Sequence, residues 1–118
     1  MTVQILGNGG AISDGLKYNS FVIDLHLLIE VPPDIIETLF SNSIPINQIE
    51  EIFISHLHGD HCFGFPFLAL KQFFDGKNEL IRLIGPKGIE NRLKELTILA
   101  FGSDHPVMNW INSHYSFL

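Results

Sequence analysis

One short segment limits the possible folds of this chain more than any other: the run SHLHGDHCFGF at residues 55–65. Half of the chain's 6 histidines and one aspartate fall in it, in the order H-x-H-x-D-H. The apolar run EIFI comes directly before, and a short apolar run of this kind is typical of a buried strand. The fold must therefore place a cluster of polar side chains at the end of a buried strand.

Strand-like and helix-like segments alternate along the chain. Short apolar runs rich in β-branched residues predict strands at 2–7, 50–55 and 80–85, two strands joined by a turn near His26 within 20–31, and the opening of a strand at 113–118. Apolar residues at helical spacing predict helices over 33–41, from near Pro66 to Gly76, and from about Pro86 onward. This alternation indicates an α/β layered fold.

Composition limits the number of domains and the partners. A chain of 118 residues, 46% hydrophobic and 17% charged, is suited to one modest globular domain. The formal net charge of −6 argues against a broad nucleic-acid-binding face, because phosphate contacts need clustered Lys and Arg. It does not exclude a nucleic-acid substrate that is bound mainly at a metal centre.

The sequence also predicts a cytoplasmic protein. Cys62 is the only cysteine, so it cannot form an intramolecular disulfide. The N-terminus lacks the basic region and apolar stretch of a secretory signal. No apolar run approaches the roughly 20 residues that are needed to cross a bilayer, so no membrane association is expected.

The spacing within the histidine motif favours a metal site. His56 and His58 are two residues apart at a strand end, so their side chains point to the same side. We expect Gly59 to allow a sharp turn that brings Asp60 and His61 back to the same point. Converging imidazole nitrogens and a carboxylate oxygen suit zinc, manganese or iron(II).

Two ions explain the motif better than one. A single tetrahedral ion could not comfortably use all four groups, but two ions about 3.5–4 Å apart could share them. We assign His56 and His58 to one ion, and Asp60 and His61 to the other. Such a pair makes hydroxide available from a bridging water, which is hydrolysis chemistry and needs no organic cofactor. A solvated polar loop is the alternative interpretation of the motif.

Other features receive structural interpretations. GNGGAIS at residues 7–13 lacks the Lys-Ser/Thr of a phosphate-binding loop, so we interpret it as a turn. Cys62 has no base devoted to it and is predicted to be a buried thiol rather than a nucleophile. Asp104 and His105 are interpreted as a loop pair before Pro106. The isolated histidines His26 and His114, like His105, are treated as ordinary.

A family resemblance adds to this reading. SHLHGDHCFGFPFLAL resembles the signature of the metallo-β-lactamase-fold hydrolases, most closely that of their ribonuclease Z-like branch. ILGNGGAIS resembles the opening strand and glycine turn of that branch, and LIGPKGIENRL resembles the strand and helix after its motif. The resemblance implies an αβ/βα metallo-β-lactamase-type sandwich with a dinuclear site at one edge. Residues 1–118 would be the N-terminal part of a single metallo-hydrolase domain, its N-terminal αβ half.

The resemblance also suggests roles for individual residues. The positions that match the family's first metal motif are His56, His58, Asp60 and His61. In phosphodiesterase members, the carboxylate that matches Asp60 is also credited with proton transfer, so the resemblance implies a catalytic role for Asp60.

The chain departs from the family pattern at two places. Glu30 and the following prolines stand where many relatives carry an Asp-Gly pair. Relatives also supply another His, a bridging Asp and a final His from later in the chain, where only His105 and His114 remain here. His114 falls near the position of the third ligand in some relatives, but it also fits the strand that precedes that ligand.

The expected function is therefore that of a metal-dependent hydrolase, a ribonuclease Z-like phosphodiesterase that uses a metal-bridged hydroxide and two divalent ions. Zinc is the expected metal, with manganese or iron as alternatives, and the substrate is a small-molecule or nucleic-acid phosphodiester. The alternatives are a thioester or lactone hydrolase on the same fold, or a non-catalytic fragment with an incomplete metal site. Half a sandwich leaves an apolar sheet face bare, so we expect a homo-oligomer or a missing C-terminal half.

Overall fold

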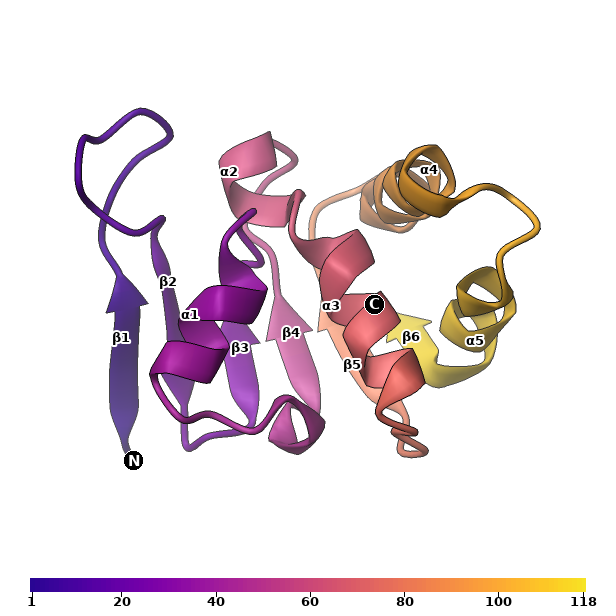
Figure 1. The fold of residues 1–118 in the computed structure, drawn as a ribbon, viewed down its shortest axis with the longest axis horizontal. Helices are drawn as coiled ribbons and strands as arrows, with labels where there is room; N and C mark the ends of the chain where they lie inside the picture. Colours follow the sequence, from indigo (N-terminus) through magenta and orange to yellow (C-terminus); the bar gives the residue numbers. More distant parts are fainter.

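The computed structural model describes all 118 residues and contains one six-stranded sheet. The strands follow one another across the sheet in chain order: β1 (Val3–Gly7), β2 (Ser20–Ile23), β3 (Leu27–Ile29), β4 (Glu51–Phe53), β5 (Ile81–Ile84) and β6 (Tyr115–Phe117). β2 is antiparallel to both β1 and β3, and β3 to β6 run parallel (Figure 1). The α/β class expected from the alternation is confirmed.

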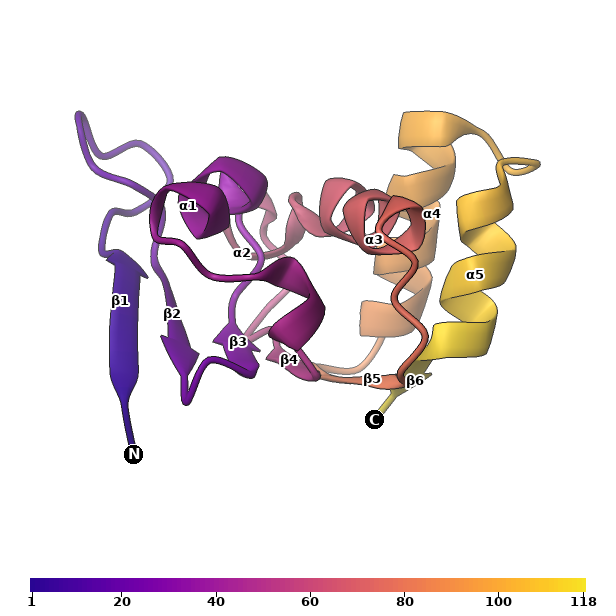
Figure 2. The ribbon, with the colours of Figure 1, turned by 60° about the horizontal axis from the view of Figure 1, so that its bottom comes forward.

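Helices supply the crossovers that the parallel strands require. They are α1 (Ile35–Ser41) with the short 3₁₀ helix η1 (Ile46–Gln48) before β4, α2 (Gly59–Cys62) and α3 (Phe65–Phe74) before β5, and α4 (Ile89–Phe101) and α5 (Pro106–His114) before β6. Parallel neighbours cannot be joined by a tight turn, so each connection must leave the sheet and return. Figure 2 shows the helices gathered on one side of the sheet.

Most predicted elements are present, with shifted ends. The strand predicted at 50–55 is confirmed, but it leaves the regular ladder after Phe53. The helix predicted over 33–41 begins at Ile35, and Pro33 lies in the turn before it. The helices starting near Pro66 and after Pro86 are confirmed, and two helices, α2 and α5, were not predicted.

The missed helix α5 has clear local causes. Pro106 occupies its first turn, where a missing N–H has no cost. The ring nitrogen Nδ1 of His105 accepts a hydrogen bond from the Val107 N–H at 3.0 Å and so caps the helix. The buried residues Val107, Trp110 and Ile111 recur at helical spacing. His105 is a loop residue, as predicted, and it also ends that loop.

The core lies between the sheet and its helices. On the covered face of the sheet, Val22, Leu28, Ile52 and Leu83 are at most 1% exposed. Because side chains alternate along a strand, their sequence neighbours point to the opposite face. Phe65 of α3 is also fully buried in this single cluster.

The opposite face of the sheet carries a second set of apolar side chains. One row crosses five strands, and its members are Ile5, Phe21, Ile29, Phe53 and Ile84. None of these five is buried, and Ile5 is 69% exposed. We call these five residues the bare row. A sheet that is apolar on both faces but covered on one has the form of one αβ half of a sandwich, as expected.

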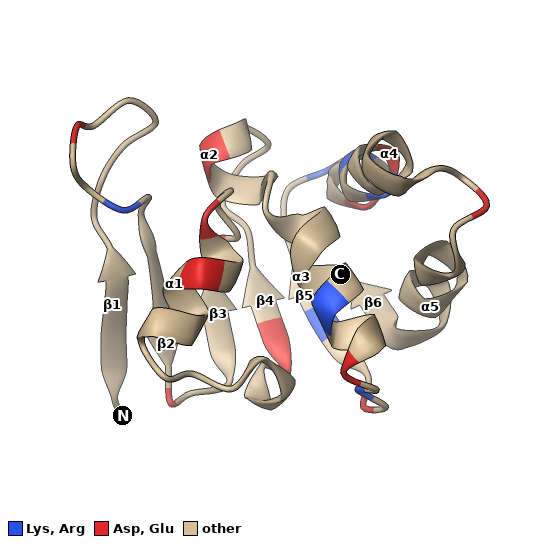
Figure 3. Cartoon of the chain, viewed as in Figure 1, with Lys and Arg blue, Asp and Glu red and all other residues tan.

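The structure bears on what the sequence indicates about nucleic acids and membranes. Figure 3 shows the basic residues spread over the β1–β2 loop, α3, β5 and α4 rather than gathered on one element. This distribution agrees with the argument against a broad nucleic-acid-binding face. None of the helices combines the length and the apolar composition that crossing a bilayer would require.

Candidate metal centre

Two neighbouring parallel strands bring the polar residues to one edge of the sheet. Glu30 directly follows β3, and His56 follows β4 after two intervening residues. The backbone N–H of Glu30 donates to the carbonyl of Phe53 at 2.8 Å, which continues the β3–β4 pairing past the end of β3. The carboxyl ends of parallel strands meet at the same edge, so these two positions become neighbours.

The segment after β3 also holds helix α2 in place. The Val31 N–H donates to the carbonyl of His61 at 2.8 Å, and the Gly64 N–H donates to the carbonyl of Val31 at 3.0 Å. A Cβ at Gly64 would lie 2.0 Å from the carbonyl oxygen of Pro32. Only glycine allows this close backbone approach, which brings the motif against the residues that follow β3.

The turn within the motif differs from the expected one. Gly59 does not adopt a positive φ; it is the first residue of α2. The reversal is helical, because the His61 N–H donates to the carbonyl of His58 at 2.9 Å. A Cβ at Gly59 would lie 2.8 Å from the Phe63 ring, so packing and not backbone freedom explains the glycine. The expectation of a glycine bend was wrong, but the helical turn still returns Asp60 towards the strand end.

The side chains that the sequence singled out lie close together. The ring centroids of His56 and His58 are 4.9 Å apart, and those of His56 and His61 are 3.8 Å apart. The Oδ2 atom of Asp60 lies 3.1 Å from Nε2 of His61. Three imidazoles and a carboxylate therefore share one partly exposed region at the sheet edge.

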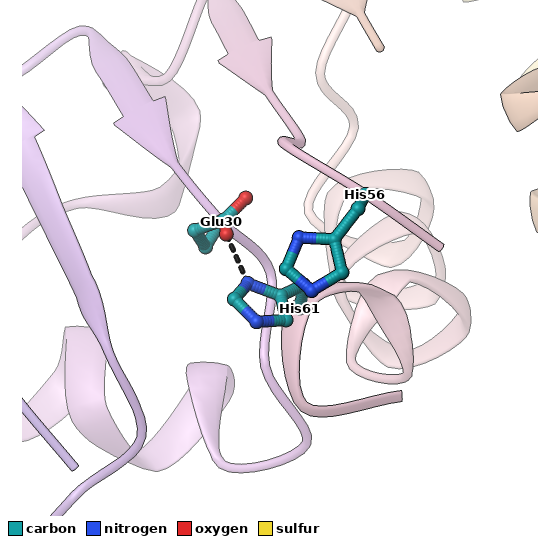
Figure 4. Close-up of side chains that lie close together, drawn as sticks. All are labelled: Glu30, His56 and His61. Carbon is teal, nitrogen blue, oxygen red and sulfur yellow. Dashed lines mark hydrogen bonds and ion pairs between the residues drawn. The ribbon is translucent and has the colours of Figure 1, made fainter. Parts of the chain in front are cut away.

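Glu30 is a site residue that the sequence analysis did not identify. It is 3% exposed, and its carboxylate accepts hydrogen bonds from the N–H of Ser55 at 2.7 Å and the hydroxyl of Ser55 at 2.6 Å. It also contacts Nδ1 of His61, as Figure 4 shows. The candidate ligand atoms of Glu30, His56 and His61 all lie within 4.8 Å of one another. The available signal was an acidic residue directly after a strand parallel to the motif strand.

The backbone of Glu30 is strained. Its φ is 69°, in the left-handed region that side-chain-bearing residues rarely adopt. Such conformations cost on the order of 1–3 kcal/mol and persist where surrounding interactions fix them. The hydrogen bonds to Ser55 and His61 provide that fixation.

Two carboxylates contact the ring of His61, one at each nitrogen. Glu30 lies at Nδ1 of the ring and Asp60 lies at Nε2. A carboxylate at one ring nitrogen sets the tautomer and leaves the other nitrogen free to bind a metal. Since the oxygens of Glu30 already accept bonds from Ser55 and His61, Glu30 is better placed to orient than to ligate. The remaining imidazole and carboxylate donors suit a divalent ion such as zinc.

Cys62 is confirmed as a buried thiol. It is fully buried, and its Sγ donates to the carbonyls of Leu57 and His58 at 3.4 and 3.5 Å. Burial raises the pKa of the thiol, and the charge of Arg92 only partly opposes this effect. A protonated thiol that donates to the motif backbone is not an activated nucleophile.

The other histidines do not join the cluster. His26 contacts the carbonyl of Asp24 in the β2–β3 turn, and His105 caps α5. His114 ends α5 and stacks on Trp110, with ring centroids 4.6 Å apart. Because β6 is parallel to β5, the start of β6 lies at the edge opposite the cluster. His114 therefore does not supply a third ligand to this site in the described chain.

The largest hollow on the surface does not coincide with the cluster. It is a groove of about 770 Å³, lined mainly by α1, α3 and the loop after α1, with Phe40, Ile46, Phe67 and Lys71 among its walls. No histidine lines it. The candidate metal ligands therefore do not lie in this groove.

Comparison with protein families finds a match over most of the chain. The family model described as "Anti-Pycsar protein Apyc1" matches residues 1–105. Ribonuclease Z of Staphylococcus epidermidis is 41% identical over 68 residues, which cover 57% of this chain and 22% of that protein. Ribonuclease BN of Erwinia tasmaniensis is 36% identical over 97 residues, which cover 76% of this chain and 32% of that protein.

Solved structures agree on the fold. The short form of human tRNase Z matches with a TM-score of 0.73 at 27% identity, over 83% of this chain and 40% of that one. The metallo-β-lactamase fold protein YhfI of Bacillus subtilis matches with a TM-score of 0.65 at 18% identity, over 98% of this chain and 45% of that one. The chain therefore spans less than half of these relatives, and the resemblance drawn from the histidine motif is confirmed.

Proposed function

The chain belongs to the Anti-Pycsar protein Apyc1 family, within the ribonuclease Z-like branch of the metallo-β-lactamase fold, and from this premise we propose that it carries the metal-binding part of a metal-dependent phosphodiesterase. The observation that supports the proposal most strongly is the approach of ligand atoms from Glu30, His56 and His61 to within 4.8 Å of one another at the carboxyl ends of β3 and β4, with His58 beside His56 and Asp60 beside His61. Ligand sites of layered α/β folds occur at this end of the strands.

We assign the ligands as the sequence predicts. His56 and His58 would hold one divalent ion, and Asp60 and His61 would hold the other. The 3.1 Å separation between Asp60 Oδ2 and His61 Nε2 supports the second pair, because two atoms this close can bind the same ion. Glu30 would hold the ring of His61 in the orientation that points Nε2 at the metal.

A bound pair of divalent ions would lower the pKa of water and stabilise negative charge on a phosphoryl oxygen. The residues of the chain set the geometry around that chemistry. Asp60 is partly exposed, at 21% for its side chain, which supports a role for it in exchanging a proton with a substrate oxygen. The buried Glu30 is shielded from such exchange by its three hydrogen-bonding partners.

The proposed substrate is a phosphodiester, either a small molecule or a nucleic acid, and the proposed location is the cytoplasm. Names of the relatives include ribonuclease Z, ribonuclease BN and tRNase Z, which supports the phosphodiester class. The scattered basic residues and the formal charge of −6 favour recognition of the substrate through its phosphate at the metals over recognition through a broad basic face.

Metal binding is the first test. We expect the purified chain to bind zinc or manganese in isothermal titration, and the variants His56→Ala and His61→Ala to bind at least about tenfold more weakly. His26→Ala is the matched control, because His26 lies outside the cluster and should leave the affinity unchanged. Wild-type chain that takes up neither metal would instead support a non-catalytic fragment.

A substrate panel is the second test. We expect the metal-loaded full-length protein that contains this chain to hydrolyse bis-p-nitrophenyl phosphate, and both chelation and His58→Ala to abolish hydrolysis. Acyl thioesters and lactones are included because carbonyl attack uses the same activated water. Hydrolysis of the acyl substrates without hydrolysis of the phosphodiester would overturn the proposed substrate class but leave the metal centre intact.

A further inference from the structure

The backbone that carries His56 and His58 has few hydrogen bonds of regular secondary structure to hold it. The Ile54 N–H still donates to the carbonyl of Ile84 at 2.9 Å, and beyond it the chain leaves the sheet. Residues 55–58 belong to no helix or strand. On the β3 side, the Ser55 N–H is held by Glu30. Side-chain orientation at His56 and His58 therefore depends on what fixes the backbone on the other side.

Arg92 supplies that second fixation. Its Nη1 donates to the carbonyl of Leu57 at 2.9 Å, across a separation of 35 residues. Leu57 lies between His56 and His58, so the bond holds the residue that links the two rings. The same carbonyl also accepts from Sγ of Cys62 at 3.4 Å. A charged donor makes the stronger of these two bonds.

The guanidinium of Arg92 has no acidic partner. It takes part in none of the ion pairs of the chain, although Glu90 on the same helix pairs with Lys94 at 2.7 Å. A surface arginine without a structural role would be free to pair with a neighbouring carboxylate or extend into solvent. Here the only side-chain hydrogen bond of Arg92 goes to the motif backbone.

Helix α4, which carries Arg92, is anchored in the core. Ile89 is 4% exposed and Leu93 is fully buried, so the turn of helix that bears Arg92 is anchored in the core. Arg92 itself is half-buried. The side chain of Arg92 can therefore hold the Leu57 carbonyl at a fixed position relative to α4.

We infer that Arg92 is a positioning residue of the metal centre, which fixes the His56–Leu57–His58 backbone from α4 as Glu30 fixes it from β3. The inference rests on the proposed function, because it assigns to Arg92 the role of keeping the rings of His56 and His58 oriented for metal binding. Arg92 would not itself touch metal or substrate.

Metal titration of three variants tests the inference. We expect Arg92→Ala to weaken zinc binding by roughly tenfold to 100-fold, the range for residues that orient metal ligands. The visible absorption spectrum of the cobalt(II)-loaded chain should also shift, because the ligand geometry changes. Arg92→Lys retains a donor and should recover part of the affinity. Lys94→Ala removes a charge from the same helix without contacting the motif, and should match wild type.

A metal-free measurement separates this inference from the proposed function. In NMR spectra of the apo chain, Arg92→Ala should move the ring signals of His56 and His58 and leave those of His26 in place. Unchanged ring signals, or wild-type zinc affinity and cobalt spectrum in Arg92→Ala, would overturn the inference. If the wild-type chain binds no metal but Arg92→Ala still moves the ring signals of His56 and His58, the proposed function fails and the positioning role of Arg92 stands. If Arg92→Ala does not fold, Arg92→Lys carries both measurements.

Discussion

Two buried polar clusters join distant parts of this chain, and they differ in what they leave accessible. The first links Glu30 to Ser55 and His61 across 25 and 31 residues at the sheet edge. The second links Gln72 of α3 to Tyr115 of β6 across 43 residues, through a hydroxyl that donates to Oε1 at 2.5 Å. Gln72 is fully buried and Tyr115 is 5% exposed.

The two clusters differ in whether all their polar atoms have hydrogen-bond partners and in whether they are accessible to solvent. Both oxygens of Glu30 have partners, and the exposed His56 lies next to the cluster. By contrast, Nε2 of Gln72 has no partner, and both residues of its cluster are at most 5% exposed. Burial of polar groups alone therefore does not indicate function; convergence of ligand atoms at an open edge does.

The largest expected effect comes from Glu30→Gln. The substitution keeps the size of the side chain but removes the charged acceptor of up to three hydrogen bonds, so the free energy of unfolding should fall by about 3 kcal/mol. Zinc affinity should fall roughly tenfold or more, because His61 loses its orienting partner. Urea unfolding and calorimetric titration measure the two effects. Glu37→Gln, at an exposed carboxylate on α1, should change the stability by less than about 0.5 kcal/mol.

Tyr115→Phe should give a stability loss of about 2 kcal/mol without a change in metal affinity. It leaves the buried Oε1 of Gln72 without its donor, and an unsatisfied buried group costs about 1–3 kcal/mol. Adding Gln72→Leu should restore part of the stability, because both polar partners are then absent. A fall in zinc affinity in Tyr115→Phe would contradict the separation of the two clusters.

The two clusters should also differ at high pH. Burial raises the pKa of Tyr115 above its usual value of 10.0, because the folded state favours the neutral phenol. Its contribution to stability is therefore fully present below pH 10 and declines above it, by up to about 1.4 kcal/mol per pH unit. Denaturant unfolding between pH 9 and 11 measures this slope. Tyr115→Phe should make it shallower; an identical slope in the variant would refute the assignment.

Ser55→Ala is expected to have the smallest effect of the series. It removes the hydroxyl that donates to Glu30 at 2.6 Å but keeps the backbone N–H bond at 2.7 Å, so the loss should be about 1 kcal/mol. Zinc affinity should fall less than in Glu30→Gln. An effect as large as that of Glu30→Gln would show that the hydroxyl, and not the carboxylate network as a whole, controls the site.

Much of this architecture could be predicted from local patterns. The motif residues His56, His58 and His61 are adjacent in sequence, so their approach to one another depends only on one strand end and one turn. Even there the turn was misassigned, because a four-residue helix such as α2 has no periodicity to detect. The helix α5 did carry a signal, in Pro106 and the spacing of Val107, Trp110 and Ile111, which the strand-like residues that follow it obscured.

The partners from distant segments could not be predicted in this way. Glu30 reaches the motif because β3 and β4 are parallel neighbours, and Arg92 reaches it because α4 packs beside α3. Neither the pairing of β3 with β4 nor the packing of α4 can be detected in a short stretch of sequence. A charged residue that follows a strand, or faces one from a helix, is uninformative until the strand order is known.

The bare row has a consequence for how the protein is made. Its five members come from five strands, and the last of them, Ile84, is separated from the first by most of the chain. Because the strands pair in chain order, the row can grow strand by strand during synthesis: Ile5, Phe21 and Ile29 can align before Phe53 and Ile84 have been made. Folding of the domain does not bury this row, so each strand that is added enlarges an apolar surface at which chains can associate, until a covering layer packs on it.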